Sequence, residues 1–298
     1  MQVNVRGLPV NYVEHGSGRE IVFLHGRPAD HRLLTTAFEP IFEARPGWRR
    51  IYLDLPGMGR TPGAAWIRTI HDVLDVVDGA ISSILPGAPF ALVGASYGGY
   101  LALGLVHRRA AGLTGLALVA PAVEWDDEQL RRPPRRVFHV DADTVATLTD
   151  EERFWTSVSV VQVPETLAAF RAGVLPGMRI ADHDFLARID DGGPLSVDVR
   201  RLAEPFERPT LILAGRQDTN VGYQDAIELL ESYPRATLAV LDRAGHGLRA
   251  EQQTLFRALT NEWLDRMELE EPRNPAAPTP PGIETPRGTS TLSDPHHT

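Results

Sequence analysis

Short apolar runs alternate with segments of helical periodicity along most of the chain. Uninterrupted apolar runs of about four to eight residues are typical of buried strands, whereas apolar positions spaced by roughly three or four residues are typical of helices. The predicted strands are 21–24, 50–53, 90–93, 113–120, 210–214 and 237–241. The predicted helices are 32–42, 69–85, 100–106, 224–233 and 252–267. This alternation predicts an α/β fold with a mostly parallel sheet and helices on both faces.

Both ends and a long central segment depart from this alternation. Residues 3–13 alternate apolar and polar positions, which predicts a hairpin of two edge strands. We interpret residues 121–209 as an inserted helical cap over the carboxyl ends of the strands, and 1–120 together with 210–271 as the core. Three helical patterns occur in the insertion, at 141–161, 164–172 and 182–189. Residues 272–298 are rich in Pro, Thr and Ser, which predicts a disordered tail.

The sequence Gly94-Ala-Ser-Tyr-Gly98 joins the predicted strand 90–93 to an apolar, helix-forming segment. This is the G-x-S-x-G pattern of a nucleophile elbow, in the strand–turn–helix context that the motif requires. The sharp turn holds Ser96 in a strained conformation, and glycine is needed on either side because a Cβ atom would clash. The helix start then directs free N–H groups toward the Ser96 hydroxyl. The loop lacks the lysine of a phosphate-binding loop and the glycine spacing of a dinucleotide site.

Composition narrows the classes of function. The chain has 298 residues and a formal net charge of −9, which argues against nucleic-acid and anionic-membrane partners. It contains no cysteine, so a disulfide framework, a thiolate nucleophile and a cysteine-based metal site are excluded. The N-terminal residues lack the pattern of a secretory signal, and we therefore expect a cytoplasmic protein. We expect a small-molecule substrate, and the sequence does not define the oligomeric state.

The loops that follow the predicted strands carry the residues of an acyl-transfer site. In a sheet of this kind, ligands bind outside the carboxyl ends of the strands, where these loops meet. A serine hydroxyl needs a base, and a carboxylate behind the base fixes its tautomer. His246 and Asp218 are the predicted base and acid for Ser96, and their chain order is the one expected for this fold. The backbone N–H groups of Arg27 and Tyr97 are the predicted oxyanion donors.

Other residues near these loops have competing interpretations. Glu124 is a rival to Asp218 because it follows the strand 113–120 closely. We expect Asp54 to anchor its own loop by binding backbone N–H groups. The histidines and aspartates of the insertion lack a recognisable metal spacing, so we expect no metal.

Five motifs together resemble the α/β-hydrolase-fold serine hydrolases. They occur in the order that this family shows and span the chain from about Val3 to Met267. They are His25-Gly26-Arg27-Pro28, Asp54-Leu-Pro-Gly-Met-Gly-Arg-Thr61, Gly94-Ala-Ser-Tyr-Gly-Gly99, Gly215-Arg-Gln-Asp218 and Ala244-Gly-His246. The resemblance implies a Ser–His–Asp triad, with no metal and no organic cofactor. It also implies that His25 shapes the oxyanion loop. Some members of the family place the acid soon after the strand that corresponds to 113–120, which is why Glu124 is a rival to Asp218.

The resemblance also limits the reactions to be considered. We expect hydrolysis of a carboxylic ester or lactone of a small, partly apolar molecule. The alternatives are a proline iminopeptidase-like peptidase, a carbon–carbon bond hydrolase, and a lyase, cyclase or ligand receptor on the same scaffold. A peptidase would need an acidic group for the free amino terminus, and the candidates are Glu151, Glu152, Asp182 and Asp184. The aromatic residues of the insertion expected to line the pocket are Trp125, Phe138, Phe154, Trp155 and Phe170.

Overall fold

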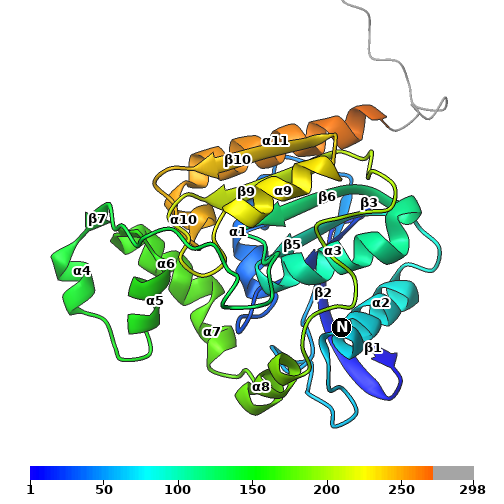
Figure 1. Cartoon of the computed structure of the whole chain (residues 1–298), viewed down its shortest axis with the longest axis horizontal. Helices are drawn as coiled ribbons and strands as arrows, with labels where there is room; N and C mark the ends of the chain where they lie inside the picture. Colours follow the sequence, from blue (N-terminus) through cyan, green and yellow to red (C-terminus); the bar gives the residue numbers. More distant parts are fainter. Residues whose placement is uncertain (271–298) are drawn as a thin grey trace, which may run out of the picture.

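An eight-stranded sheet forms the centre of the molecule, and the computed structural model describes residues 1–270 (Figure 1). The strands are β1 (Gln2–Val5), β2 (Leu8–His15), β3 (Arg19–Leu24), β4 (Trp48–Leu53), β5 (Phe90–Ala95), β6 (Leu113–Val119), β9 (Thr210–Gly215) and β10 (Ala236–Leu241). They lie in the order β1-β2-β4-β3-β5-β6-β9-β10. Neighbours from β4 to β10 pair in parallel, whereas β2 is antiparallel to β1 and β4. The predicted tail, 272–298, lies outside the described residues.

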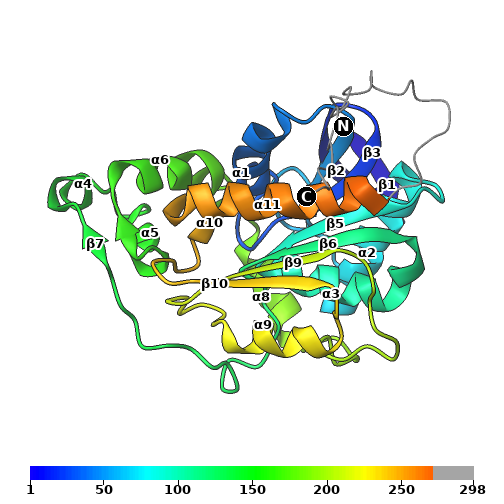
Figure 2. The ribbon, with the colours of Figure 1, turned by 90° about the horizontal axis from the view of Figure 1, so that it is seen from above.

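Helices cover both faces of this sheet, as the sequence pattern predicts. One face carries α1 (Arg32–Phe42) and α11 (Gln253–Glu270), whose buried Phe38, Phe256 and Trp263 share one apolar core (Figure 2). The other face carries α2 (Ile70–Ile84), α3 (Tyr97–Arg109) and α9 (Gln224–Glu228). The parallel sheet is therefore buried on both sides, which explains why its strands read as nearly continuous apolar runs. The predicted fold class is confirmed.

The N-terminal hairpin differs from the prediction in one respect. β1 is an edge strand, but β2 lies between β1 and β4 and is therefore an interior strand. Its residues Leu8, Val10 and Tyr12 are buried, although the sequence alternation alone suggested an exposed edge.

The segment between β6 and β9 contains short helices and a two-stranded sheet. Its elements are β7 (His139–Val140), α4 (Ala142–Ala146), α5 (Arg153–Val158), β8 (Val161–Gln162), α6 (Pro164–Gly173), α7 (Leu175–Met178) and α8 (His183–Asp191). The single helix predicted over 141–161 is wrong. The Thr149 N–H group donates to the Glu152 carboxylate in a turn between α4 and α5, and β8 then pairs with β7.

Figure 2 shows α4, α5 and α6 beyond one end of the sheet, beside α10 (Leu248–Glu251). Two 3₁₀ turns complete the described elements, at Ala110–Gly112 and Leu229–Glu231. The second continues α9, so the predicted helix 224–233 is in fact one short helix followed by a 3₁₀ turn. Among the helices of residues 1–270, none has both the length and the apolar composition that a membrane crossing requires.

Candidate active site

Ser96 stands at the junction of β5 and α3 with a backbone conformation that serine rarely adopts. Its φ and ψ angles are 51° and −119°, and holding a residue in such a conformation costs about 1–3 kcal/mol. The flanking glycines make the turn possible. A Cβ atom on Gly94 would lie 2.4 Å from the carbonyl oxygen of Gly98, and one on Gly98 would lie 2.1 Å from that of Leu24. The turn therefore presents the serine side chain at the carboxyl end of the sheet.

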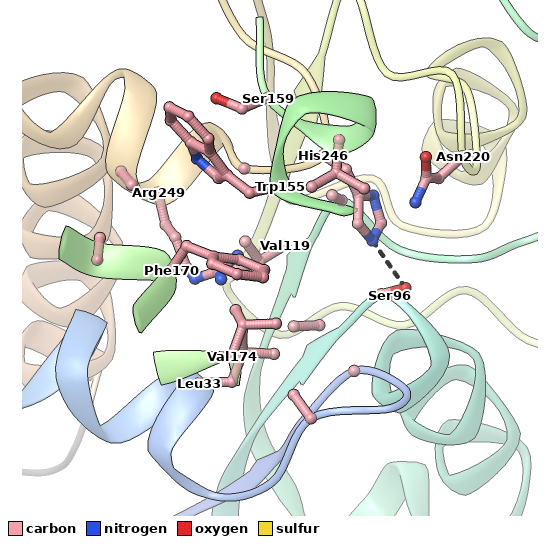
Figure 3. A pocket seen from close by; sticks show the side chains of 18 of the residues that line it. Leu33, Ser96, Val119, Trp155, Ser159, Phe170, Val174, Asn220, His246 and Arg249 are labelled. Carbon is pink, nitrogen blue, oxygen red and sulfur yellow. Dashed lines mark hydrogen bonds between the residues drawn. The ribbon is translucent and has the colours of Figure 1, made fainter. Parts of the chain in front are cut away.

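The structure brings Ser96, His246 and Asp218 into one hydrogen-bonded chain. His246 Nε2 lies 3.0 Å from Ser96 Oγ (Figure 3), and His246 Nδ1 lies 2.8 Å from Asp218 Oδ2. A carboxylate only accepts hydrogen bonds, so Nδ1 carries the imidazole proton and Nε2 faces the serine hydroxyl as an acceptor. Three loops supply these residues, after β5, β9 and β10.

Asp218 is fully buried and firmly held. Its Oδ1 atom accepts the N–H groups of Asn220 at 2.8 Å and Val221 at 3.2 Å, so both oxygens have partners. The rival acid Glu124 has other contacts. It accepts the N–H groups of Trp125 and Asp126 and forms an ion pair with Arg200 at 3.1 Å. Asp218 is therefore the carboxylate that can orient His246.

The loop after β3 lies against the nucleophile. A Cβ atom added to Gly26 would come within 3.0 Å of Ser96 Cβ. The next residue is Arg27, and Tyr97 follows Ser96 at the first position of α3. Within residues 1–270, neither the Arg27 nor the Tyr97 N–H group donates to a protein acceptor. Both donors are therefore available to a ligand beside the serine hydroxyl.

His25 holds this loop in place without facing the serine. Its Nε2 atom accepts the Leu55 N–H group at 3.0 Å, and its Nδ1–H group therefore donates to the Gly26 carbonyl at 2.9 Å. Burial lowers the pKa of His25, and nearby Asp54 only partly opposes this shift. A neutral imidazole matches the donor and acceptor that it contacts.

Asp54 anchors the following loop. Its carboxylate accepts the N–H groups of His31 and Arg60 and the side chains of Asn11 and His31. Burial alone would raise the pKa of Asp54, but these hydrogen bonds, first among them that of the His31 side chain, lower it well below its usual range.

One cluster among the described residues has the donor atoms of a metal site. Asp30, His31 and Asp54 each place one such atom within 4.8 Å of the others. The Arg32 guanidinium binds Asp30, however, and the Asp54 carboxylate already has the partners described above. Because these carboxylates are occupied by protein donors, we assign no metal to the cluster.

An apolar pocket opens beside Ser96 and His246 (Figure 3). Its larger apolar side chains include Leu33, Val119, Phe154, Trp155, Phe170 and Val174. Three predicted aromatic residues, Phe154, Trp155 and Phe170, thus line this pocket. Trp125 lines a second, wider hollow on another side of Ser96 and packs against Tyr97 and Tyr100.

Phe138 lines neither of these two hollows. Its ring lies beneath the Arg136 guanidinium, 4.7 Å from the ring centroid, where the chain approaches β7. Aromatic character alone could not show which side of the inserted segment would face the serine.

The sequence analysis missed two charged residues near His246. Arg249 lines the apolar pocket. The Glu251 carboxylate accepts the N–H groups of Gly245 at 2.7 Å and Val160 at 2.5 Å, and the Ser159 hydroxyl at 3.0 Å. Burial raises the pKa of Glu251, and the bonds to Val160 and Gly245 oppose this shift. Both residues lie in α10, which precedes α11, and only their spacing from His246 could have suggested them.

Comparison with known proteins agrees with this geometry. The family model described as "Serine aminopeptidase, S33" matches residues 18–253. An AB hydrolase superfamily protein of Bacillus subtilis, YisY, is 27% identical over 82% of this chain and 91% of its own length. A pimeloyl-[acyl-carrier protein] methyl ester esterase of Legionella pneumophila is 26% identical over 84% of this chain and 97% of its own length. The crystal structure of an alpha/beta superfamily hydrolase from Oenococcus oeni has a TM-score of 0.82 at 26% identity, covering 90% of this chain and 99% of that one. The chain therefore belongs to the serine aminopeptidase S33 family of α/β hydrolases and is a serine hydrolase.

Proposed function

We propose that this protein hydrolyses a carboxylic ester or lactone of a small, partly apolar molecule through Ser96, His246 and Asp218. The observation that carries the proposal is the continuous chain of hydrogen bonds from Ser96 through His246 to buried Asp218. The Legionella relative, named as a methyl ester esterase, supports an ester as the substrate.

In the proposed reaction, Ser96 Oγ attacks the substrate carbonyl while His246 Nε2 takes the hydroxyl proton. Asp218 keeps the imidazole oriented and stabilises its protonated form. The N–H groups of Arg27 and Tyr97 stabilise the tetrahedral oxyanion, and the loss of one such donor typically costs about 3–4 kcal/mol of transition-state stabilisation. His246 then protonates the leaving alcohol, and a water activated by the same imidazole releases the acid from Ser96.

We further propose that residues 121–209 form a cap on a core made of 1–120 and 210–271. Two contacts support the placement of this cap over the site, because each joins the inserted segment to a loop near Ser96. The Arg27 guanidinium binds both carboxylate oxygens of Asp190, at 2.6 and 2.9 Å. Glu251 joins the Gly245 backbone to Val160. Specificity would then depend on how the cap encloses the pocket.

An aminopeptidase would need a carboxylate that is free to bind the amino terminus of its substrate. Glu151 and Glu152 form ion pairs with Arg179 and Arg171, and Asp182 accepts an N–H group in the first turn of α8. Asp184, the remaining candidate, is exposed and lines neither of the two hollows beside Ser96. The acidic residues that line the wider hollow also have protein partners, and they are Glu124, Asp126, Asp127 and Asp190. These contacts favour an ester over a peptide substrate.

A fluorophosphonate probe tests the nucleophile. We expect the wild-type protein and the Ser96→Ala variant to fold alike, with only the wild-type protein labelled. Ser82→Ala, which removes an exposed hydroxyl on α2, is the matched control and should label fully. A panel of p-nitrophenyl esters, lactones and proline anilides then ranks ester against peptide hydrolysis. A folded wild-type protein that does not label would refute the proposed mechanism, and faster cleavage of the anilides would refute the ester assignment.

A further inference from the structure

Arg249 places a positive charge in a pocket whose walls are otherwise largely apolar. The residue belongs to α10 and lines the pocket together with Ser96 and His246. Figure 3 shows its side chain entering the pocket close to Trp155, Phe170 and Val174. Within residues 1–270, its guanidinium forms no hydrogen bond and no ion pair. Five N–H donors are therefore left to the pocket.

Glu251 does not form an ion pair with the Arg249 guanidinium. It is two residues away in the chain, and its charge acts on Arg249 through space, but the two side chains form no ion pair within 4.0 Å. Both Glu251 oxygens already accept protein donors, from the segment 159–161 and from Gly245. The carboxylate thus accepts hydrogen bonds from those groups and not from the guanidinium.

An unpaired cation in an apolar pocket is costly unless a ligand supplies its partner. Burial lowers the pKa of Arg249 to about 10, and Glu251 opposes this shift, so the guanidinium is still protonated at neutral pH. An arginine fork matches the two oxygens of a carboxylate. A single guanidinium balances one negative charge, which suits a carboxylate better than a phosphate dianion.

We propose that Arg249 binds a carboxylate of the substrate, so that the preferred esters carry a free carboxylate at the far end of the part that the pocket binds. This inference rests on the proposed ester hydrolysis and assigns the class of its substrate. The apolar side chains of the pocket would contact the hydrocarbon between the ester and the carboxylate, and Arg249 would fix its far end.

Matched pairs of esters test the assignment on either side of the ester bond. The first series compares mono-p-nitrophenyl esters of dicarboxylic acids, from succinate to suberate, with p-nitrophenyl esters of the corresponding monocarboxylic acids. The second compares acetates of ω-hydroxy acids with acetates of simple alcohols. The quantity measured is the ratio of kcat/KM for the anionic ester to kcat/KM for its neutral partner.

We expect Arg249→Met to lower this ratio by about 10- to 100-fold for at least one chain length, since a charge-assisted hydrogen bond is lost. Arg249→Lys keeps the charge but not the fork, and should retain part of the preference. Arg243→Met removes an exposed arginine from the turn after β10 and should leave the ratio unchanged. Hydrolysis of the neutral esters by each variant shows that it is folded.

If Arg249→Met changes the ratio by less than about threefold in both series, the inference is overturned. Hydrolysis of the neutral esters would in that case still support the proposed function. If no ester is hydrolysed, the proposed function fails, and calorimetry on Ser96→Ala decides the inference separately. The inference is supported if Ser96→Ala binds monomethyl adipate more strongly than methyl hexanoate, and if the double variant with Arg249→Met loses this difference. Equal binding of the two esters overturns it.

Discussion

Replacing Glu251 tests whether the inserted segment and the histidine loop are held together by one carboxylate. One Glu251 oxygen accepts the Val160 and Val161 N–H groups and the Ser159 hydroxyl, and the other accepts the Gly245 N–H group. Gly245 precedes His246, so a change at this contact reaches the base of the active site directly.

The expected loss in the free energy of unfolding follows from the hydrogen-bond donors that each variant leaves without an acceptor. Glu251→Gln keeps one oxygen for Val160 but turns an NH₂ group toward the Gly245 N–H donor, which should lower the free energy of unfolding by about 1–3 kcal/mol. Glu251→Ala removes the acceptor from all four donors at once, and water can replace only some of these bonds. We therefore expect the free energy of unfolding of this variant to fall by about 2–4 kcal/mol.

Thermal unfolding and ester hydrolysis are measured together. At about 2–4 °C per kcal/mol for a chain of this size, Glu251→Gln should lower Tm by roughly 2–12 °C. Its kcat should fall while labelling of Ser96 slows, because the His246 loop loses an anchor. Glu204→Gln, at an exposed position, is the matched control. A Glu251→Ala variant with wild-type Tm and wild-type kcat would refute the argument that this carboxylate joins the two parts.

Three other changes test separate parts of the site. Asp218→Asn should lower kcat by about 10⁴-fold with little change in Tm, because an amide can hold His246 in the wrong tautomer; a fall below about tenfold, measured with a p-nitrophenyl ester, would contradict the proposed triad. His25 has a lowered pKa in the folded state, so its stabilising contribution is present above the usual value of 6.5 and is lost as the pH falls below it. Denaturant titrations should show that His25→Gln has a shallower loss of stability than the wild-type protein from about pH 7 to pH 5, and identical slopes would exclude this role. Gly98→Ala would place a Cβ atom 2.1 Å from the Leu24 carbonyl oxygen, so we expect a loss of about 1–3 kcal/mol in chemical denaturation together with slower Ser96 labelling; unchanged values would show that the turn tolerates a side chain.

The parts of the fold that sequence predicts well are those that local chemistry determines. The buried strand 90–93, the glycines of the elbow and the start of α3 follow from sterics within one short stretch. The order of Ser96, Asp218 and His246 then follows from the alternation of strands and helices. The choice of Asp218 over Glu124 needed the tertiary structure, because each of these residues follows a predicted strand.

The inserted segment was predicted less accurately for a physical reason. Its helices are short, and side-chain contacts such as that between Glu152 and the Thr149 N–H group interrupt a pattern that periodicity alone reads as one helix. The charges of Arg249 and Glu251 were also missed. Arginine and glutamate are common on exposed helical surfaces, and only the fold reveals that both lie against the pocket.

Two of the contacts between the inserted segment and the rest of the chain involve the loops that would perform the proposed chemistry. Arg27 follows Gly26, which lies against Ser96, and its guanidinium binds Asp190 of α8. Glu251 binds the residue before His246 and also the backbone of Val160. A displacement of the inserted segment would therefore disturb the Arg27 loop and the His246 loop as well as the pocket wall. We therefore expect variants at Asp190 to alter kcat as well as KM, because Asp190 holds the side chain of Arg27 in the loop that lies against Ser96.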